Sequence, residues 1–156
     1  MIVGYAYVVA DLIHIGHLKH LRACKGLCDK LIVGVLTDGA TMEKKDKPII
    51  SFGERLEIVK NLKFVDVVVK QETYSPLSNV ENLQPDILFE SMSHSSDALV
   101  EAMALMEKND KRLITMPYYA GQSSTAIKNK ILKRWKYTEE IHPKVINLEG
   151  DQNDKS

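Results

Sequence analysis

Residues 2–36 read "IVGYAYVVADLIHIGHLKHLRACKGLCDKLIVGVL", and this stretch predicts a strand, a helix and a second strand. "IVGYAYVV" (2–9) and "KLIVGVL" (30–36) are continuous apolar runs rich in β-branched residues, which is typical of strands buried on both faces. Between them an apolar stripe recurs at helical spacing, made of Leu18, Leu21, Cys24 and Cys28. Two such strands joined by a helix favour a right-handed crossover and a parallel sheet.

The same alternation continues along the chain. Three more strands are predicted by "FVDVVV" (64–69), "DILFE" (86–90) and "RLITM" (112–116). Helices are expected from Ser51, which has the capping-box spacing to Glu54, from about residue 97 to 108, and from about residue 124 to 135. We therefore predict an α/β fold, a doubly wound, mainly parallel five-stranded sheet of Rossmann-like type. A single domain is expected over residues 1–140, followed by a partly disordered tail over residues 141–156.

Composition narrows the range of possible partners and locations of the protein. The chain of 156 residues has the size of one compact domain, and its 21 basic residues balance 21 acidic ones. This balance favours neither a nucleic acid nor an anionic membrane as partner. The most apolar segment, residues 2–10, is about half as long as a membrane helix and has no basic region before it. We expect a cytoplasmic location.

The unusual residues follow the predicted strands, and in such sheets ligands bind beyond the carboxyl ends of the strands. His14 and His17 follow the first strand and can each donate an imidazole N–H, while Gly16 between them lets an anion approach the backbone. Other groups suited to phosphate are Lys44, Lys45, Lys47 and Arg55, and the helix start at Gly121, Ser123, Ser124 and Thr125. Their convergence on one edge predicts a phosphate-handling site.

Simpler interpretations exist for each feature alone. The two histidines are compatible with ordinary packing, the lysines with a solvated loop, and Ser123 to Thr125 with a plain helix cap. Cys24 and Cys28, with His20 and His17 one and two turns earlier, are compatible with a thiolate and imidazole metal site. Buried cysteine more often behaves as a small hydrophobe, and we predict no metal ligands of the protein's own.

The motifs also resemble a known family. "DLIHIGH" (11–17) looks like the H-x-G-H signature of the small cytidylyltransferases within the nucleotidyltransferase superfamily. "YYAGQSSTAI" (118–127) is similar to the family's second signature, R-T-x-G-I-S-T-T, and residues 37–69 resemble its lysine loop and arginine-bearing helix. The resemblance covers about residues 1–133, with order and spacing kept.

The resemblance implies transfer of CMP from CTP to a small phosphorylated alcohol or phosphonate, with release of pyrophosphate. The implied catalytic residues are His14, His17, Lys44 and Arg55. The implied nucleotide-binding residues are Val9, Ala10, Asp11, Gly16, His17, Lys47, Ser91, Tyr119, Gly121, Ser123, Ser124 and Thr125. An acceptor pocket would use Lys44, Arg55, Tyr74, His94 and Tyr118. Mg²⁺ would accompany the triphosphate, and a homodimer is implied.

Three departures from the family pattern bear on the choice of nucleotide. Val8-Val9-Ala10 stands where the family has Gly-Thr-Phe, and Tyr118 stands where the second signature begins with arginine. Ser91 begins a turn that in relatives carries Gly-Asp-Asp and contacts the nucleoside. Two alternatives therefore stay open: an adenylyltransferase of the same superfamily, acting on a flavin or a sugar phosphate, and a non-catalytic nucleotide-binding module.

Overall fold

The computed structural model describes residues 1–92 and 96–141. Its five strands are β1 (Val3–Val8), β2 (Lys30–Leu36), β3 (Val67–Gln71), β4 (Ile87–Ser91) and β5 (Arg112–Met116). Its helices are α1 (Ile15–Lys25), α2 (Asp38–Met42), α3 (Phe52–Lys60), α4 (Leu77–Leu83), α5 (Ser96–Lys108) and α6 (Ser124–Ile141). The predicted alternation of strands and helices is confirmed.

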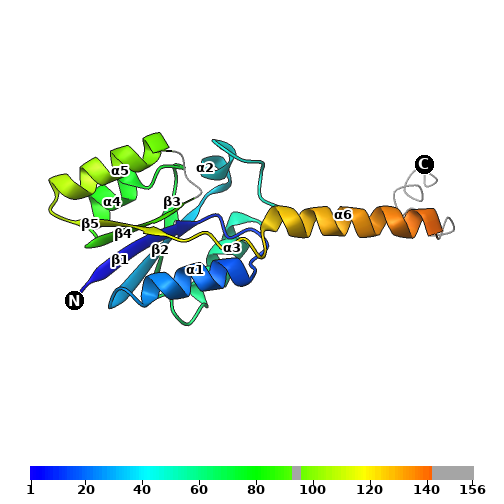
Figure 1. The fold of residues 1–156 in the computed structure, drawn as a ribbon, viewed down its shortest axis with the longest axis horizontal. Helices are drawn as coiled ribbons and strands as arrows, with labels where there is room; N and C mark the ends of the chain where they lie inside the picture. Colours follow the sequence, from blue (N-terminus) through cyan, green and yellow to red (C-terminus); the bar gives the residue numbers. More distant parts are fainter. Residues whose placement is uncertain (93–95, 142–156) are drawn as a thin grey trace. The chain divides into compact units, whose positions relative to one another are not determined.

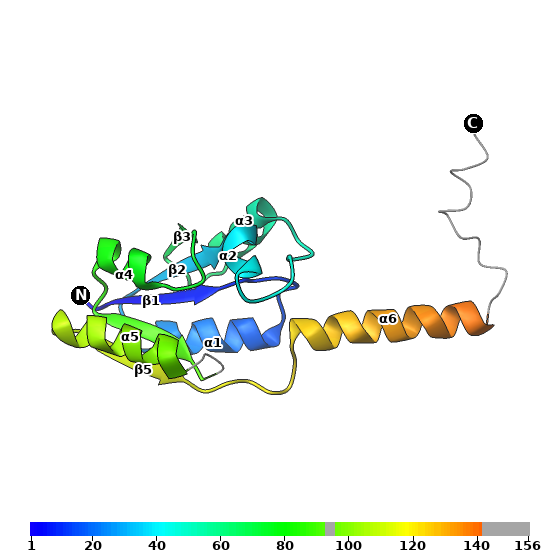
Figure 2. The same cartoon turned by 90° about the horizontal axis from the view of Figure 1, so that it is seen from above.

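All five strands are parallel and lie in the order β3-β2-β1-β4-β5. Figure 2 shows β3, β2, β1 and β5 in this succession. The chain winds outward from β1 to β3 and then returns to place β4 on the other side of β1. The strand order therefore reverses between β1 and β4, which is where doubly wound sheets bind their ligands. The predicted fold class is confirmed.

Helices cover both faces of the sheet (Figure 1). On one face α1 and α3 bury Leu21, Cys24 and Val59 against inward side chains of β1, β2 and β4. On the other face α4 and α5 bury Val80, Ala102 and Met106. Because β2 is covered on both sides, six of its seven residues are buried, as its continuous apolar run predicted.

The structure differs from the sequence prediction in four local elements. The helix α6 continues to Ile141 rather than ending near residue 135. β3 begins at Val67 rather than residue 64, because Phe64 and Val65 contact the core from the turn before the strand. The helices α2 and α4 were not predicted, since five and seven residues are too few to show an apolar stripe. The predicted helix start at Ser51 is confirmed, with Ser51 Oγ accepting from the Glu54 N–H at 3.4 Å.

The chain divides into two compact units, Met1–Gln122 and Ser123–Ser156. The sheet and helices α1 to α5 belong to the first unit, and α6 begins the second. The predicted domain boundary near residue 140 stays a prediction, because the predicted tail lies almost entirely outside the described residues. Among the helices described, none combines the length and the apolar character needed to cross a bilayer.

Candidate active site

His14 and His17 form the start of α1, directly beyond the carboxyl end of β1. His14 is the N-cap residue, and its Nδ1 accepts a hydrogen bond from the Gly16 N–H at 3.0 Å. The Nδ1 of His17 accepts from the His14 N–H at 3.2 Å. The two ring centroids are 4.1 Å apart. Both rings therefore satisfy N–H groups that a helix start would otherwise leave without partners.

The same bonds determine which ring nitrogen carries the proton. Burial lowers the pKa of His14, and burial, with the neighbouring His14, His20 and Lys45, lowers the pKa of His17 to about 4. Both rings are therefore neutral at pH 7. Because Nδ1 accepts in each neutral ring, the proton is on Nε2. The pair thus presents two uncharged N–H donors at the edge of the sheet.

Gly16 makes this arrangement possible by having no side chain. A Cβ atom on Gly16 would lie 2.7 Å from His14 Cε1 and 3.2 Å from Tyr119 Cδ1. Lys19 Nζ lies 4.3 Å from the centroid of the same Tyr119 ring. The first turn of α1 is thus packed between His14 and Tyr119. The lack of a side chain at Gly16 therefore leaves room for the His14 ring. That Gly16 also lets an anion approach the backbone stays a prediction.

Asp11 joins the loop after β1 to the lysine loop after β2. It is 5% exposed, and its two carboxylate oxygens each accept a backbone N–H at 3.0 Å, from Ile49 and Ile50. Its neighbours Ala10 and Leu12 have positive φ angles of 62° and 49°, a conformation that non-glycine residues seldom adopt. Asp11 therefore holds the two loops together, while its implied part in nucleotide binding stays a prediction.

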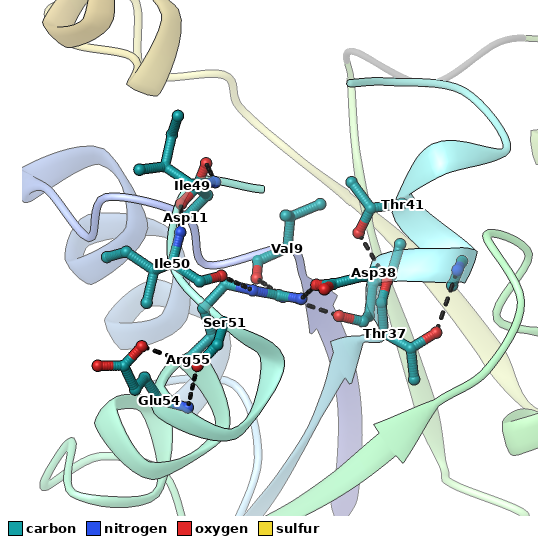
Figure 3. A network of polar contacts seen from close by, with 12 residues as sticks. Val9, Asp11, Thr37, Asp38, Thr41, Ile49, Ile50, Ser51, Glu54 and Arg55 are labelled. Atoms are coloured by element: carbon teal, nitrogen blue, oxygen red, sulfur yellow. Dashed lines mark hydrogen bonds and ion pairs between the residues drawn. The ribbon is translucent and has the colours of Figure 1, made fainter. Parts of the chain in front are cut away.

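Arg55 lies beneath these loops rather than facing them. Its side chain is fully buried, and its guanidinium donates to the carbonyl oxygens of Val9, Leu36 and Ile50 and to the Asp38 carboxylate (Figure 3). The resemblance implied that Arg55 is catalytic and binds the acceptor, whereas its buried guanidinium is engaged by groups of the protein itself. Because the guanidinium donates to three carbonyl oxygens and one carboxylate, it holds the ends of β1 and β2 in position.

Asp38 is the residue at this site that the sequence analysis missed. One of its carboxylate oxygens lies 2.8 Å from Arg55 Nη2, and this is the charge partner of the buried guanidinium. A signal was present in the sequence, since Thr37 followed by Asp38 is typical of a helix start. Thr37 Oγ1 accepts from the Ala40 N–H at 3.0 Å and caps α2.

The remaining predicted residues of the first unit have different settings. Lys44 and Lys47 are exposed in the loop that follows α2. Ser91 ends β4 and pairs with Met116, while Tyr118 is 59% exposed. Tyr74 follows β3, and its N–H donates to Glu43 at 2.6 Å. His94 lies outside the described residues. These residues therefore keep their sequence-based roles as predictions.

Ser123, Ser124 and Thr125 belong to the second unit and form the start of α6. Ser123 Oγ accepts from the Ala126 N–H at 3.0 Å, and the Ser123 carbonyl oxygen accepts from the Ile127 N–H. The local structure is a capped helix start, as the sequence indicated. Gly121, in the first unit, could not carry a Cβ without meeting the Tyr119 phenol. Phosphate binding by this segment stays a prediction.

Cys24 is a buried core residue, and Cys28 packs partly buried against the same core. Cys24 is fully buried, which raises the pKa of its thiol to about 12, and its Sγ lies 3.9 Å from His20 Nε2. Cys28 Sγ donates to the Cys24 carbonyl oxygen at 3.4 Å. In the described part of the chain no group of three or more histidine, cysteine or acidic side chains has a metal-binding arrangement. The alternative of a thiolate and imidazole metal site has no support there.

Comparisons with known proteins identify the family of the chain. A family model described as cytidylyltransferase-like matches residues 6–130. The bifunctional protein HldE of Citrifermentans bemidjiense is 34% identical over 127 residues, which is 80% of this chain and 26% of that protein. HldE of Trichlorobacter lovleyi is 33% identical over 132 residues, 83% of this chain and 26% of that protein. The chain thus spans about a quarter of the length of these curated relatives.

Solved structures give the same result for the fold. The lipopolysaccharide core biosynthesis protein of Thermoplasma volcanium GSS1 superposes with a TM-score of 0.66 at 26% identity, over 76% of this chain and 97% of that one. The pantoate-beta-alanine ligase of Francisella tularensis superposes with a TM-score of 0.55 at 13% identity, over 85% of this chain and 70% of that one, and shares the fold. The resemblance predicted from the two signature motifs is confirmed.

Proposed function

Because the chain belongs to the cytidylyltransferase-like family of nucleotidyltransferases, we propose that it moves a nucleotidyl group from a nucleoside triphosphate to a small phosphorylated acceptor. The observation that carries this proposal is the pair of neutral histidines at the start of α1, each with its proton on Nε2. Two such donors, held by the backbone, suit the phosphate oxygens on which negative charge grows during the transfer.

For the donor we propose ATP, and for the acceptor a phosphorylated sugar. The support for ATP comes from the pantoate-beta-alanine ligase of Francisella tularensis, which shares the fold and whose structure is described as complexed with beta-gamma ATP. The support for a sugar acceptor comes from the structure described as a lipopolysaccharide core biosynthesis protein, since such a core is an oligosaccharide. The departures from the cytidylyltransferase pattern at Val8-Val9-Ala10 and at Ser91 leave the choice between ATP and CTP open. CTP with a small phospho-alcohol or phosphonate is the second candidate, favoured by the match to the family described as cytidylyltransferase-like.

In the proposed reaction an oxygen of the acceptor phosphate attacks the α-phosphorus. A new P–O bond forms, the bond between the α-phosphorus and the bridging oxygen to the β-phosphate breaks, and pyrophosphate leaves with the electron pair. His14 and His17 donate to the phosphate oxygens from one side. Lys44 and Lys47 supply positive charge from the exposed loop that Asp11 anchors. This division of tasks needs no covalent enzyme intermediate.

Mg²⁺ fits this site as an ion carried by the triphosphate. The groups that the described chain offers there are imidazole N–H donors and lysine ammonium groups, which bind phosphate oxygens rather than a cation. Asp11 uses both of its carboxylate oxygens on backbone N–H groups. When bound, the ion would neutralise charge on the triphosphate and align it.

The proposal is tested by pyrophosphate release. The protein is incubated with Mg²⁺ and either ATP or CTP, against hexose 1-phosphates, glycerol 3-phosphate, phosphocholine, phosphoethanolamine, hydroxyethylphosphonate and flavin mononucleotide. We expect release with ATP and a hexose phosphate. Release only with CTP and a phospho-alcohol would establish the second candidate. Tight nucleotide binding without release from any pair would favour a non-catalytic module.

Ser124→Ala, which removes a hydroxyl at the start of α6, is expected to weaken nucleotide binding.

A further inference from the structure

Lys19 is a positively charged residue of α1 that the proposed reaction does not yet use. It stands two residues after His17 and is exposed. Side chains on a helix lean toward the helix N-terminus, so a long side chain at this position reaches back over the first turn. Lys19 Nζ lies 4.3 Å from the centroid of the Tyr119 ring, and this ring packs against Gly16 in that turn. The ammonium group is therefore directed toward the histidine end of α1.

Tyr119 connects this lysine to the histidine pair. A Cβ atom on Gly16 would lie 2.7 Å from His14 Cε1 and 3.2 Å from Tyr119 Cδ1, so the two rings border the same point of the turn. His14 Cε1 is bonded to Nε2, the atom that carries the proton of this ring. The phenol oxygen of Tyr119 fills the space that a Cβ atom on Gly121 would need. Tyr119 thus holds the ammonium group of Lys19 in the neighbourhood of the His14 donor.

A cation at this place has a chemical use. The two histidines are neutral, so they donate N–H groups to a triphosphate without balancing its negative charge. The family's second signature begins with arginine, which carries a permanent charge, and Tyr118 stands there in this chain. An ammonium group has three N–H donors, and the ring face lies on one side of it only. An exposed lysine held in this way can therefore still bind phosphate oxygens.

We propose that Lys19, positioned by Tyr119, is a further phosphate-binding residue that contacts the phosphate oxygens of the nucleoside triphosphate next to the histidine pair. This role rests on the proposed function for the identity of its ligand. It can be tested by binding alone, because a contact to phosphate requires no transfer reaction. Tyr119 acts as a positioning residue, since its ring fixes the ammonium group.

Arg22 provides a matched control on the same helix. It is exposed, and its Cζ lies 5.6 Å from the centroid of the Phe64 ring, so it too is a cation beside an aromatic ring. Phe64 lies in the turn before β3, at the amino end of the parallel sheet and opposite to the histidine edge. Lys19→Met and Arg22→Met each remove one charge and one cation–π contact from α1. Only the first change reaches the histidine end.

The test measures dissociation constants for Mg·ATP, Mg·CTP and magnesium tripolyphosphate by calorimetry. Tripolyphosphate has no base or ribose, so it reports on phosphate contacts alone. For Lys19→Met we expect the constants for tripolyphosphate and for the preferred nucleotide to rise about fivefold or more, with a weaker dependence on salt. Lys19→Arg keeps the charge and should restore most of the affinity that Lys19→Met loses. Arg22→Met, folded by its circular dichroism, should bind each probe as the parent does.

Substitutions at Tyr119 test how the lysine is held. Tyr119→Phe keeps the ring and Tyr119→Leu removes it, so we expect the larger loss of tripolyphosphate affinity in Tyr119→Leu. In the double variant Lys19→Met/Tyr119→Leu the loss should be smaller than the product of the two single losses, because the ring acts through the lysine. Losses that multiply would overturn the positioning role of Tyr119.

Three results would overturn the assignment of Lys19. These are affinity in Lys19→Met no lower than in Arg22→Met, loss of nucleotide affinity in Lys19→Met without loss of tripolyphosphate affinity, and no binding of any of the three probes by the parent protein. Failure of the proposed function looks different. Binding of nucleotide and tripolyphosphate that depends on Lys19, with no pyrophosphate released from any nucleotide and acceptor, would leave the phosphate contact standing and remove the reaction.

Discussion

The Nδ1 atom of His17 accepts a hydrogen bond from the backbone N–H of His14, and the two imidazole centroids lie 4.1 Å apart. The Nδ1 atom of His14 likewise accepts from the Gly16 N–H, so Nδ1 of each histidine caps the helix. The Nε2 atom of each ring takes no part in this capping. Capping uses Nδ1 and the proposed donation to phosphate uses Nε2, so substitutions at one side chain can test the two roles separately.

Substitutions at His17 are expected to separate these tasks. In His17→Gln the amide nitrogen stands near the place of Nε2, so a donor is kept and the bond to His14 is lost. In His17→Asn the amide oxygen stands near the place of Nδ1, so the bond is kept and the donor is lost. We expect His17→Asn to lower turnover by about 10²-fold or more with little loss of stability. His17→Gln should keep more activity and lose about 1 kcal/mol of stability. Equal turnover in both variants would contradict the assignment.

His14→Ala tests the first member of the pair. Its ring accepts the Gly16 N–H and carries the second donor. We expect turnover to fall by about 10²-fold, because a preorganised donor to the transition state is lost. The measurement is single-turnover pyrophosphate release at saturating nucleotide. Near-parental turnover in a folded His14→Ala protein would show that the ring only caps the helix.

Gly16→Ala is expected to reduce activity even though alanine favours helices. The added Cβ would lie 2.9 Å from His14 Nδ1, so the His14 ring must move away from its bond with the Gly16 N–H. Gly53→Ala is the matched control, because Gly53 lies in the first turn of α3 and a Cβ there would meet nothing within 4 Å. We expect Gly53→Ala to raise the free energy of unfolding by about 0.5–1 kcal/mol. A similar gain in Gly16→Ala, with full activity, would argue against the close packing described here.

The lowered pKa of His17 predicts how stability depends on pH. The unfolded chain binds a proton at His17 below about pH 6.5, whereas the folded protein does so only near pH 4. The unfolded state therefore carries more protons between these values, and stability falls as the pH drops from about 6.5 to about 4. We expect a loss of about 1 to 3 kcal/mol in urea unfolding across this window. His17→Gln should reduce this slope, and an unchanged slope would place its origin elsewhere.

Arg55→Lys is expected to destabilise the protein without any ligand present. A lysine cannot reproduce bonds to the carbonyl oxygens of Val9, Leu36 and Ile50 together, and buried acceptors would lose their donors. We expect a loss of about 2–4 kcal/mol in the free energy of unfolding. Arg22→Lys, at an exposed position on α1, should change it by less than about 0.5 kcal/mol. Unchanged stability with weaker nucleotide binding would restore the sequence-based role of Arg55 in holding phosphate.

The sequence predicted the architecture well, because fold information of this kind is local and periodic. The apolar run of β2 and the stripe on α1 each identify an element and its buried face, and the Ser51 capping box gives a helix start. The short helices α2 and α4 escaped prediction, since a helix of five or seven residues has too few apolar positions to show a period. The start of β3 was misplaced because Phe64 and Val65 are apolar for a tertiary reason, as core contacts made from a turn.

The sequence by itself determined that the chain has a parallel α/β sheet and a histidine pair after the first strand. Both follow from the spacing of neighbours along the chain. The tertiary structure alone decided that the Arg55 side chain is buried against the ends of β1 and β2, and that Tyr7 meets Glu90. These contacts join residues 46 and 83 positions apart, and no spacing rule predicts them. The crossover that places β4 beside β1 brings Tyr7 to Glu90, and the helix α3 brings Arg55 to Val9, so both contacts depend on how distant elements pack together.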